Sequence, residues 1–189
     1  MKLTTRGRYG LRALIDLAVH EEAGAVSAQS IAERQELSES YLEQLIRSMK
    51  KAGLVESVRG AGGGYHLARP ASQISVGDVL RALEGSIDAV SCPAITIEGM
   101  RDNSGISRGG EADTAITKEL IEKFDLNQFA RENSGCDGAD WCVTKYVWKR
   151  INDAISQAVD SIMLDQLVQE SRILIEESGE APVPSACRN

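Results

Sequence analysis

The chain has 189 residues and a formal net charge of −7, with 42% hydrophobic and 26% charged residues. This length allows one domain or two small ones around a hydrophobic core. Because no apolar run approaches the ~18 residues of a membrane-spanning helix, we expect a cytoplasmic, globular protein with no membrane partner. The charge is uneven: residues 1–69 carry 10 Lys and Arg against 8 Asp and Glu, whereas residues 70–189 carry 11 against 20. The first third is therefore suited to a polyanion such as DNA.

The first predicted elements form a helix-turn-helix. Apolar residues recur at helical spacing from Thr5 to His20, which predicts one helix. Ser27 and Ser38 are each placed to cap a further helix, and Gly53 is placed to end the second of these. The apolar residues of that second helix fall on one side: Leu42, Leu45, Ile46 and Met49. It is the candidate recognition helix of a DNA-binding module.

A glycine-rich hairpin follows the two helices. Residues 54–58 and 65–67 are predicted as short strands on either side of RGAGGG, which is typical of the wing of a winged helix. Pro70 closes the module, and Ser75 with Asp78 has the spacing of a capping box at the start of another short helix. The predicted fold class is mainly α, with an α+β wing: a winged helix-turn-helix DNA-binding domain over residues 1–84.

The second half of the chain is predicted as a loop followed by a long helix. Residues 85–142 lose periodicity and form a cysteine-bearing loop with an insertion, in which TAITKELIEKFDLNQFA makes one short helix. Residues 143–171 are predicted as one helix, with residues 172–189 as a disordered tail. The helix has a continuous apolar stripe: Val147, Ile151, Ala154, Ile155, Ala158 and Ile162. Such a stripe outside a small domain is most simply buried against a twin, so we expect a dimerisation helix and a homodimer.

The recognition helix has side chains suited to DNA. Its exposed positions start with Ser38, Ser40, Tyr41, Glu43 and Gln44 and continue with Arg47, Lys50 and Lys51. Gln pairs with adenine, Glu accepts from cytosine, and hydroxyls and cations hold phosphates. Arg59, among the glycines of the wing, is placed to enter a narrow minor groove. The alternative is an ordinary solvated helix face beside a surface hairpin.

The cysteines are the other candidate for chemistry. Cys92, Cys136 and Cys142 lie in one loop segment and could hold an iron-sulfur cluster through their thiolates. Zinc is disfavoured, because zinc sites use pairs spaced two to four residues apart and four protein ligands. The alternative is a set of unrelated surface thiols, which is the expected state of Cys187. His20 and His66 are expected to be structural, and no nucleophile-base constellation is present, so we predict that the chain is not an enzyme.

Four segments carry a resemblance to a known family. KLTTRGRYGLRALIDLA, SYLEQL, VRGAGGGYHLARP and SVGDVLRALEGSIDA closely resemble the IscR-like iron-sulfur cluster regulators, a winged-helix family that includes IscR, NsrR and CymR. The resemblance covers residues 1–92 and resumes from Cys136 to about Glu170. It implies a dimeric transcription factor that binds a double-stranded DNA operator. Its implied recognition residues are Ser40, Tyr41, Glu43 and Gln44, with Arg59 in the minor groove and Cys92, Cys136 and Cys142 as cluster ligands.

Two departures from the family leave the fourth ligand open. Here 43 residues, Pro93 to Gly135, separate the first cysteine from the second, and Lys145 stands where IscR has a histidine ligand. The aspartate ligand of NsrR aligns with Arg8. The remaining candidates are Asp137, Asp140, Cys187, a residue of the insertion, or an exogenous thiol or water. The cluster type, 2Fe-2S or 4Fe-4S, is equally open.

The resemblance predicts a transcriptional regulator, in most cases a repressor, of iron-sulfur cluster assembly or stress genes, whose DNA affinity an iron-sulfur cluster controls. The alternative is a cluster-free regulator of cysteine or sulfur metabolism that senses through thiol oxidation or a partner protein. A cluster-assembly or a cysteine-synthesis protein is the class of partner that the family suggests.

Overall fold

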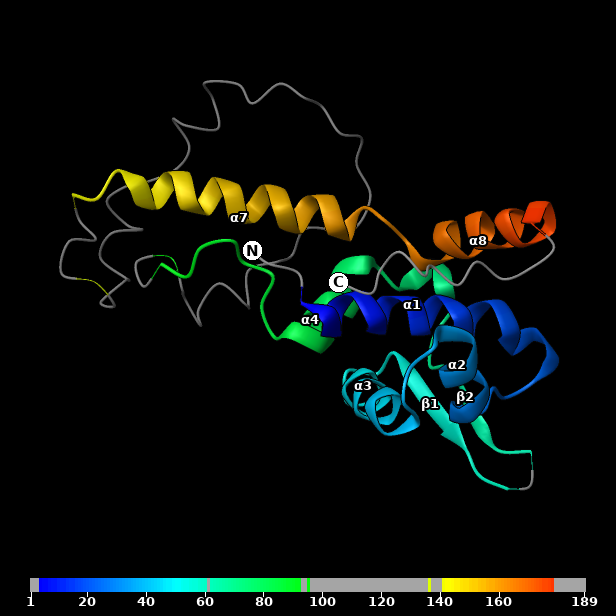
Figure 1. The fold of residues 1–189 in the computed structure, drawn as a ribbon. Coiled ribbons are helices and arrows are strands. Elements are labelled where there is room, and N and C mark those ends of the chain that lie inside the picture. The colour runs from blue at the N-terminus through cyan, green and yellow to red at the C-terminus, as the bar shows by residue number, and fades with distance from the viewer. Residues whose placement is uncertain (1–3, 61, 93–94, 96–135, 137–140, 179–189) are drawn as a thin grey trace. The chain divides into compact units, whose positions relative to one another are not determined.

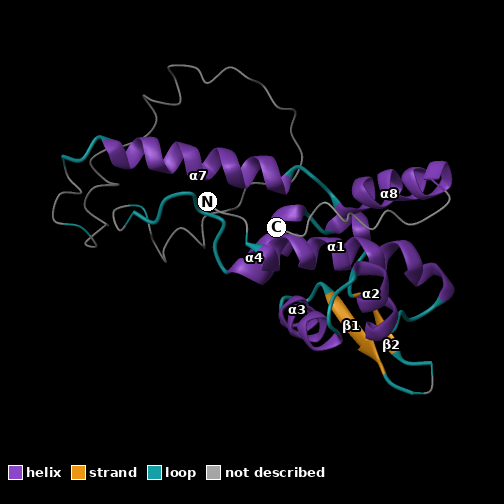
Figure 2. Ribbon diagram, viewed as in Figure 1, coloured by secondary structure: helices purple, strands orange, loops and turns teal. Residues whose placement is uncertain are grey.

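The computed structural model describes residues 4–60, 62–92, 95, 136 and 141–178. It divides into two compact units, one formed by residues 1–88 and 154–189 and the other by residues 89–153. Figures 1 and 2 show the mainly helical architecture with its small hairpin of two strands. No helix within the described part of the chain is long and apolar enough to cross a membrane.

The first unit contains the predicted winged helix. Its elements are α1 (Thr5–His20), η1 (Glu21–Ala23), α2 (Ala28–Gln35), α3 (Glu39–Lys51), β1 (Val55–Val58), β2 (Gly64–Leu67), η2 (Ala71–Gln73) and α4 (Val76–Glu84). The predicted caps are confirmed, because the Ser27 hydroxyl accepts from the N–H of Ser30 and the Ser38 hydroxyl from that of Tyr41. Ser75 and Asp78 form the predicted capping box at the start of α4.

The wing is an antiparallel hairpin of β1 and β2. Val55 pairs with Leu67 and Val58 with Gly64, so the turn of the hairpin lies at the glycine-rich segment. A bridge between Val26 and Tyr65 extends the pairing beyond β2 to the segment that precedes α2. The wing is therefore attached at two places. β1 follows α3 directly in the chain, and β2 pairs with the segment before α2 through this bridge.

The core of this unit surrounds α1. Leu14 and Leu17 of α1 pack with one apolar face of α3, and the cluster also takes in Ile31 of α2 and Leu54 before the wing. The buried side chains of α3 are the four that its spacing predicts: Leu42, Leu45, Ile46 and Met49. Burial of this face leaves the opposite face of α3 in solvent, which is what a recognition helix requires.

The prediction of one continuous helix over residues 143–171 is wrong. The structure has two helices there, α7 (Thr144–Asp160) and α8 (Leu164–Ser178). Residues 161–163 instead pair with the backbone before α4: the Val76 N–H donates to the Ile162 carbonyl at 2.9 Å and the Leu164 N–H to the Ile74 carbonyl at 2.8 Å. Leu164 and Val168 of α8 then join the core. These contacts outweigh the continuous local pattern.

Two other predictions concern the ends of this region. The disordered tail predicted from residue 172 starts too early, since α8 continues to Ser178 and Arg172 pairs with Glu22 at 2.7 Å. The short helix predicted within the insertion lies outside the described residues.

Candidate DNA interface and cysteine segment

The solvent face of α3 contains the predicted recognition residues. Ser40, Glu43, Gln44 and Arg47 are exposed, and Tyr41 is half-buried. Helix geometry places Ser40, Gln44 and Arg47 on one face, three or four residues apart. Hydroxyl, amide and guanidinium groups on one exposed face have the donors and acceptors needed to contact base edges and phosphates.

Tyr41 packs against Tyr9, and Tyr9 in turn contacts Arg12. The ring of Tyr9 lies edge-on to the Tyr41 ring, with centroids 6.3 Å apart and an interplanar angle of 86°. The Arg12 guanidinium lies 5.6 Å from the centroid of Tyr9. T-shaped pairs and cation–π contacts are favourable at such separations. Both Tyr9 and Arg12 belong to α1, so α1 fixes the direction of a residue on the recognition helix.

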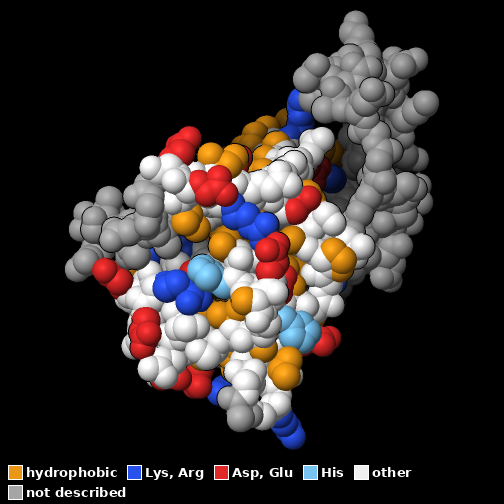
Figure 3. Space-filling view, turned by 90° about the vertical axis from the view of Figure 1, so that its right-hand side faces the viewer, with side chains coloured by type: hydrophobic (Ala, Val, Ile, Leu, Met, Phe, Trp, Pro, Cys, Tyr) orange, Lys and Arg blue, Asp and Glu red, His pale blue; other side chains and the backbone are white. Residues whose placement is uncertain are grey.

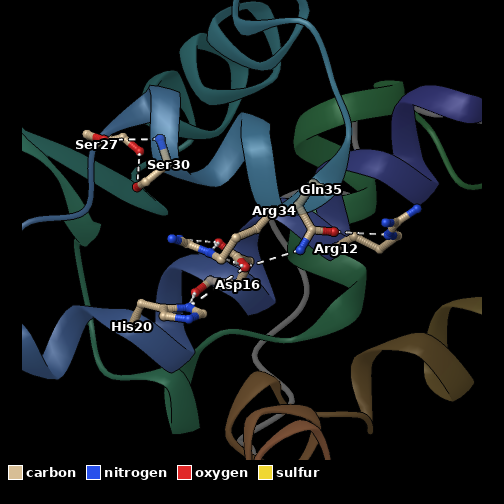
Figure 4. Close-up of polar contacts among 7 residues, drawn as sticks. All are labelled: Arg12, Asp16, His20, Ser27, Ser30, Arg34 and Gln35. Carbon is tan, nitrogen blue, oxygen red and sulfur yellow. Dashed lines mark hydrogen bonds and ion pairs between the residues drawn. The ribbon is translucent and has the colours of Figure 1, made fainter. Parts of the chain in front are cut away.

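A buried carboxylate ties α1 to the end of α2 (Figure 4). The side chain of Asp16 is 4% exposed and accepts from the Arg34 guanidinium through both of its oxygens, at 2.7 Å from Nη2 and 3.0 Å from Nε. Gln35 donates to Asp16 at 3.1 Å and accepts from Arg12 at 3.1 Å. The network therefore connects the helix before the turn to the residue that stacks on Tyr9. Sequence periodicity predicted α1 but could not show which partners its one buried carboxylate has.

The wing presents Arg59 to solvent. Arg59 is exposed, and Gly60 beside it has φ of 122°, a conformation that glycine adopts without strain. Lys50 of α3 donates to the Ser57 hydroxyl at 2.5 Å, and Arg6 of α1 donates to the Ser48 hydroxyl at 2.5 Å. The end of α3 is thus braced against both the wing and the start of α1. In the view of Figure 3 a basic side chain projects at the lower end.

The cysteine segment is described only in part. Cys92 and Cys142 are partly exposed thiols and Cys136 is an exposed one. Within the described ranges, no three His, Cys, Asp or Glu residues lie close enough together to hold a metal ion. The structure therefore does not bring the predicted triad together. Asp137, Asp140 and Cys187 lie outside the described residues.

The surroundings of Cys142 stabilise its thiolate form. Its sulfur lies 3.1 Å from the Thr144 hydroxyl, at the start of α7. This hydrogen bond, with further ones from the backbone N–H groups of Lys145 and Thr144, lowers the pKa of the Cys142 thiol. A thiolate is the form that ligates iron. Sequence reasoning missed Thr144, although a hydroxyl two residues after a cysteine at a helix start is a recognisable signal.

Lys145 occupies the position of the expected histidine and is buried, with 1% exposure. Its ammonium lies 5.1 Å from the centroid of the Tyr146 ring. Asn152, seven residues further along α7, is also buried. Residues spaced by seven fall on one helix face, so Lys145 and Asn152 lie on the same buried face of α7.

Comparisons with known proteins agree with this geometry. A sequence model of the Rrf2 family, described as an iron-dependent transcriptional regulator, matches residues 3–123. The HTH-type transcriptional regulator IscR of Pectobacterium carotovorum subsp. carotovorum is 36% identical over 174 residues, which cover 92% of this chain and 83% of that protein. The matched proteins are regulators rather than enzymes, as the sequence predicted.

Solved structures resemble most of the chain. The structure of T. potens IscR has a TM-score of 0.57 at 37% identity and covers 90% of this chain and 88% of that one. The structure of CymR, the global cysteine regulator of B. subtilis, has a TM-score of 0.57 at 32% identity and covers 90% and 98% of the two chains. The winged-helix fold is thereby confirmed.

Proposed function

The chain belongs to the Rrf2 family and is a DNA-binding transcriptional regulator, and we propose that an iron-sulfur cluster held by Cys92, Cys136 and Cys142 controls its affinity for DNA. The observation that carries the DNA-binding site is the exposed polar face of α3 beside an exposed arginine on the wing. We assign base contacts to Glu43 and Gln44. Backbone contacts fall to Ser40, Tyr41 and Arg47, and the minor groove to Arg59.

The chemistry of the donor set, three thiols, fits a cluster. Three thiols flank the insertion, and the pKa of one of them is lowered by its hydrogen bonds. Thiolates are the usual protein ligands of both 2Fe-2S and 4Fe-4S clusters, so the thiols alone do not choose between the two types. A bound cluster would supply a group that reacts with oxidants or is lost when iron is scarce. The protein's own part is to hold the thiolates and to couple their arrangement to the winged helix.

Linkage sets the size of that coupling. If cluster binding changes the affinity for DNA by some factor, DNA binding must change the affinity for the cluster by the same factor, typically about 5–150-fold. We propose that the regulator acts as a repressor of iron-sulfur cluster assembly or stress genes. We also propose that it works as a homodimer, because the exposed stripe on α7 is the apolar surface that a second copy would cover.

The cluster hypothesis is tested by anaerobic purification. We expect a coloured protein with iron, sulfide and a cluster spectrum by absorbance and EPR, and a DNA affinity that changes when the cluster is removed. Cys92→Ala, Cys136→Ala and Cys142→Ala should each abolish the spectrum, whereas Cys187→Ala is the matched control. A colourless, iron-free chain whose DNA affinity does not respond to reconstitution would refute cluster sensing.

The DNA site is tested on an operator selected from a random duplex pool. Arg59→Ala should weaken binding by about 1–3 kcal/mol, and Arg59→Lys should recover only part of the loss because the guanidinium fits a narrow groove better than an ammonium. Gln44→Ala should relax the base preference at one position of each half-site. An unchanged affinity of Arg59→Ala would remove the wing from the proposed interface.

A cluster-free thiol sensor is the second candidate. It is favoured by Lys145, which is buried where the family resemblance places a histidine ligand, and by the likeness to CymR. In this case oxidation of Cys136 and Cys142, or a cysteine-synthesis protein bound as partner, would change DNA affinity. Retention of redox-dependent DNA binding by iron-free wild-type protein, and its loss in Cys142→Ala, would support this candidate over the cluster.

A further inference from the structure

Asn152 of α7 binds the backbone just before Cys92. Its Oδ1 accepts from the N–H of Ala89 at 2.9 Å and from that of Val90 at 3.3 Å. Its Nδ2 donates to the carbonyl of Val90 at 3.0 Å. Asn152 is 9% exposed, and these three hydrogen bonds join residues that are more than sixty positions apart in the sequence. All of the atoms involved belong to the same compact unit.

The asparagine amide has the donor and the acceptor that this set of bonds uses. The segment around Ala89 and Val90 is neither helix nor strand, so its peptide groups need another partner. An asparagine amide both donates and accepts, so it offers the same hydrogen-bonding groups as one residue of a neighbouring strand. An aspartate carboxylate accepts but cannot donate to the Val90 carbonyl. The turn before the segment is fixed separately, because the Ser86 hydroxyl donates to Asp88 at 2.7 Å.

The anchor confines Cys92. Val90 is only two residues away, and two residues of extended chain span at most about 7 Å. The Cα of Cys92 therefore stays within that distance of a residue bound to α7, whatever the conformation of the 43 residues, Pro93 to Gly135, that follow. The same helix begins at Thr144, whose hydroxyl contacts the sulfur of Cys142. One helix thus holds the surroundings of both cysteines.

We propose that Asn152 is the positioning residue that confines Cys92 to the neighbourhood of α7, the helix that follows Cys142, and so keeps it within reach of the cluster site, resting on the proposed cluster function. The insertion separates Cys92 from the other two cysteines in sequence, and Asn152 compensates by fixing Cys92 to the helix that follows Cys142. Residues that orient metal ligands without touching the metal typically contribute 10–100-fold to metal affinity. The amide acts through the backbone, so its loss should change cysteine geometry rather than thiol chemistry.

The first experiment measures the positioning without any cluster. In full-length protein with Cys136→Ser and Cys187→Ser, a short bis-maleimide should link Cys92 to Cys142 within one chain, as quantified by peptide mass spectrometry. Asn152→Ala should lower the yield several-fold. Asn152→Asp, which retains only the accepting half of the contact, should be intermediate. Gln157→Ala is the matched control, because Gln157 is an exposed amide on the same helix. Equal yields with and without the Asn152→Ala substitution would overturn the proposal.

The second experiment uses Co²⁺ as the probe and the three native cysteines. Asn152→Ala should weaken thiolate-to-cobalt binding by about 10–100-fold, while the DNA affinity of the metal-free protein stays unchanged. Slow hydrogen exchange at Ala89 and Val90 in wild-type protein tests the anchor even if Asn152→Ala fails to fold, and fast exchange there would count against it. A wild-type chain that takes up no cluster refutes the proposed function, whereas the cross-link yield still decides the role of Asn152.

Discussion

At the residue scale, the hydroxyl of Thr144 favours the thiolate form of Cys142. Because the hydrogen bond lowers the pKa of the thiol, the folded, metal-free protein has more thiolate at a given pH than a free cysteine would. Thr144→Val removes the hydroxyl and should raise this pKa. The pH at which iodoacetamide alkylates Cys142 at half its maximal rate should therefore move upward, as followed by mass spectrometry of the modified peptide.

The matched variant for this prediction is Thr144→Ser, which retains a hydroxyl and should leave the alkylation profile near that of wild type. The effect should be confined to Cys142, so the profile of Cys92 in the same samples is an internal reference. An identical profile for Thr144→Val and wild type would mean that the hydroxyl does not set the thiolate population.

Asp16 joins α1 to the end of α2 through buried polar contacts. Asp16→Ala would leave Arg34 and Gln35 without their shared acceptor. Removing one partner of a buried pair costs about 3–5 kcal/mol, and because the Arg34 side chain is 27% exposed we expect about 2–4 kcal/mol here. Urea unfolding measures this as a fall in midpoint at constant slope. Glu33→Ala, which removes an exposed carboxylate next to Arg34 on α2, should change stability by less than about 0.5 kcal/mol.

At the element scale, the end of α7 forms an ion pair with α4 and packs closely against its first turn. Asp160 accepts from the Arg81 guanidinium through both of its oxygens at 2.7 Å, a bond that raises the pKa of Arg81. A Cβ on Gly77 would overlap Asp160 Oδ1. Glycine is therefore required at this helical position for a close approach between two elements rather than for its backbone freedom.

This close approach predicts that the usual gain in stability on replacing a helical glycine by alanine is lost or reversed at Gly77. Replacing a helical glycine by alanine usually stabilises a protein by about 0.5–1 kcal/mol. In wild type, Gly77→Ala displaces Asp160 and loses a partly exposed pair worth about 0–1 kcal/mol, so the gain should vanish or reverse. In an Asp160→Ala background the usual gain should return. A double-mutant cycle by urea unfolding measures the difference, and equal effects in both backgrounds would contradict the role of this close approach.

Helix starts and buried faces could be predicted from the sequence because they are local. Ser27, Ser38 and Ser75 each cap the helix that follows, and the buried positions of α3 were all identified from their spacing. The break between α7 and α8 could not be predicted, because the apolar stripe passes through it. It forms where Ile162 and Leu164 pair with the backbone before α4, a contact between segments far apart in the sequence.

The same division holds for the candidate site. The exposed residues of α3 and the wing follow from the pattern of the winged helix, whereas Asn152 and the Asp16 network depend on partners that no local pattern specifies. Cys142 was identified as a candidate ligand, but its altered pKa comes from Thr144 and the start of α7. Residue type thus predicted the chemistry, whereas its tuning depends on particular hydrogen bonds, which are local at Cys142 and long-range at Asn152 and Asp16.

At the scale of the whole molecule, α7 has an exposed apolar face that is suited to burial against a partner. Its apolar positions 147, 151, 154 and 158 are all exposed and lie on one helix face, and Val143 just before the helix continues the stripe at 74% exposure. The opposite face, from Lys145 to Val159, is buried or half-buried. One face of α7 is thus covered by its own chain, and the exposed apolar face is left for a partner, for which a second copy supplies a matching stripe.

Val147→Glu should therefore separate the dimer, because a charge at the centre of a paired apolar stripe would be buried without a partner. Sedimentation equilibrium should show a monomer, with helix content retained by circular dichroism. Binding to a duplex with two half-sites should fall by about 10²–10⁴-fold as the avidity of two linked winged helices is lost, while binding to a single half-site stays unchanged. Gln157→Glu adds the same charge beside the stripe rather than on it and should remain dimeric. A Val147→Glu protein that stays dimeric would place the interface elsewhere, and equal losses on full and half sites would indicate damage to the winged helix itself.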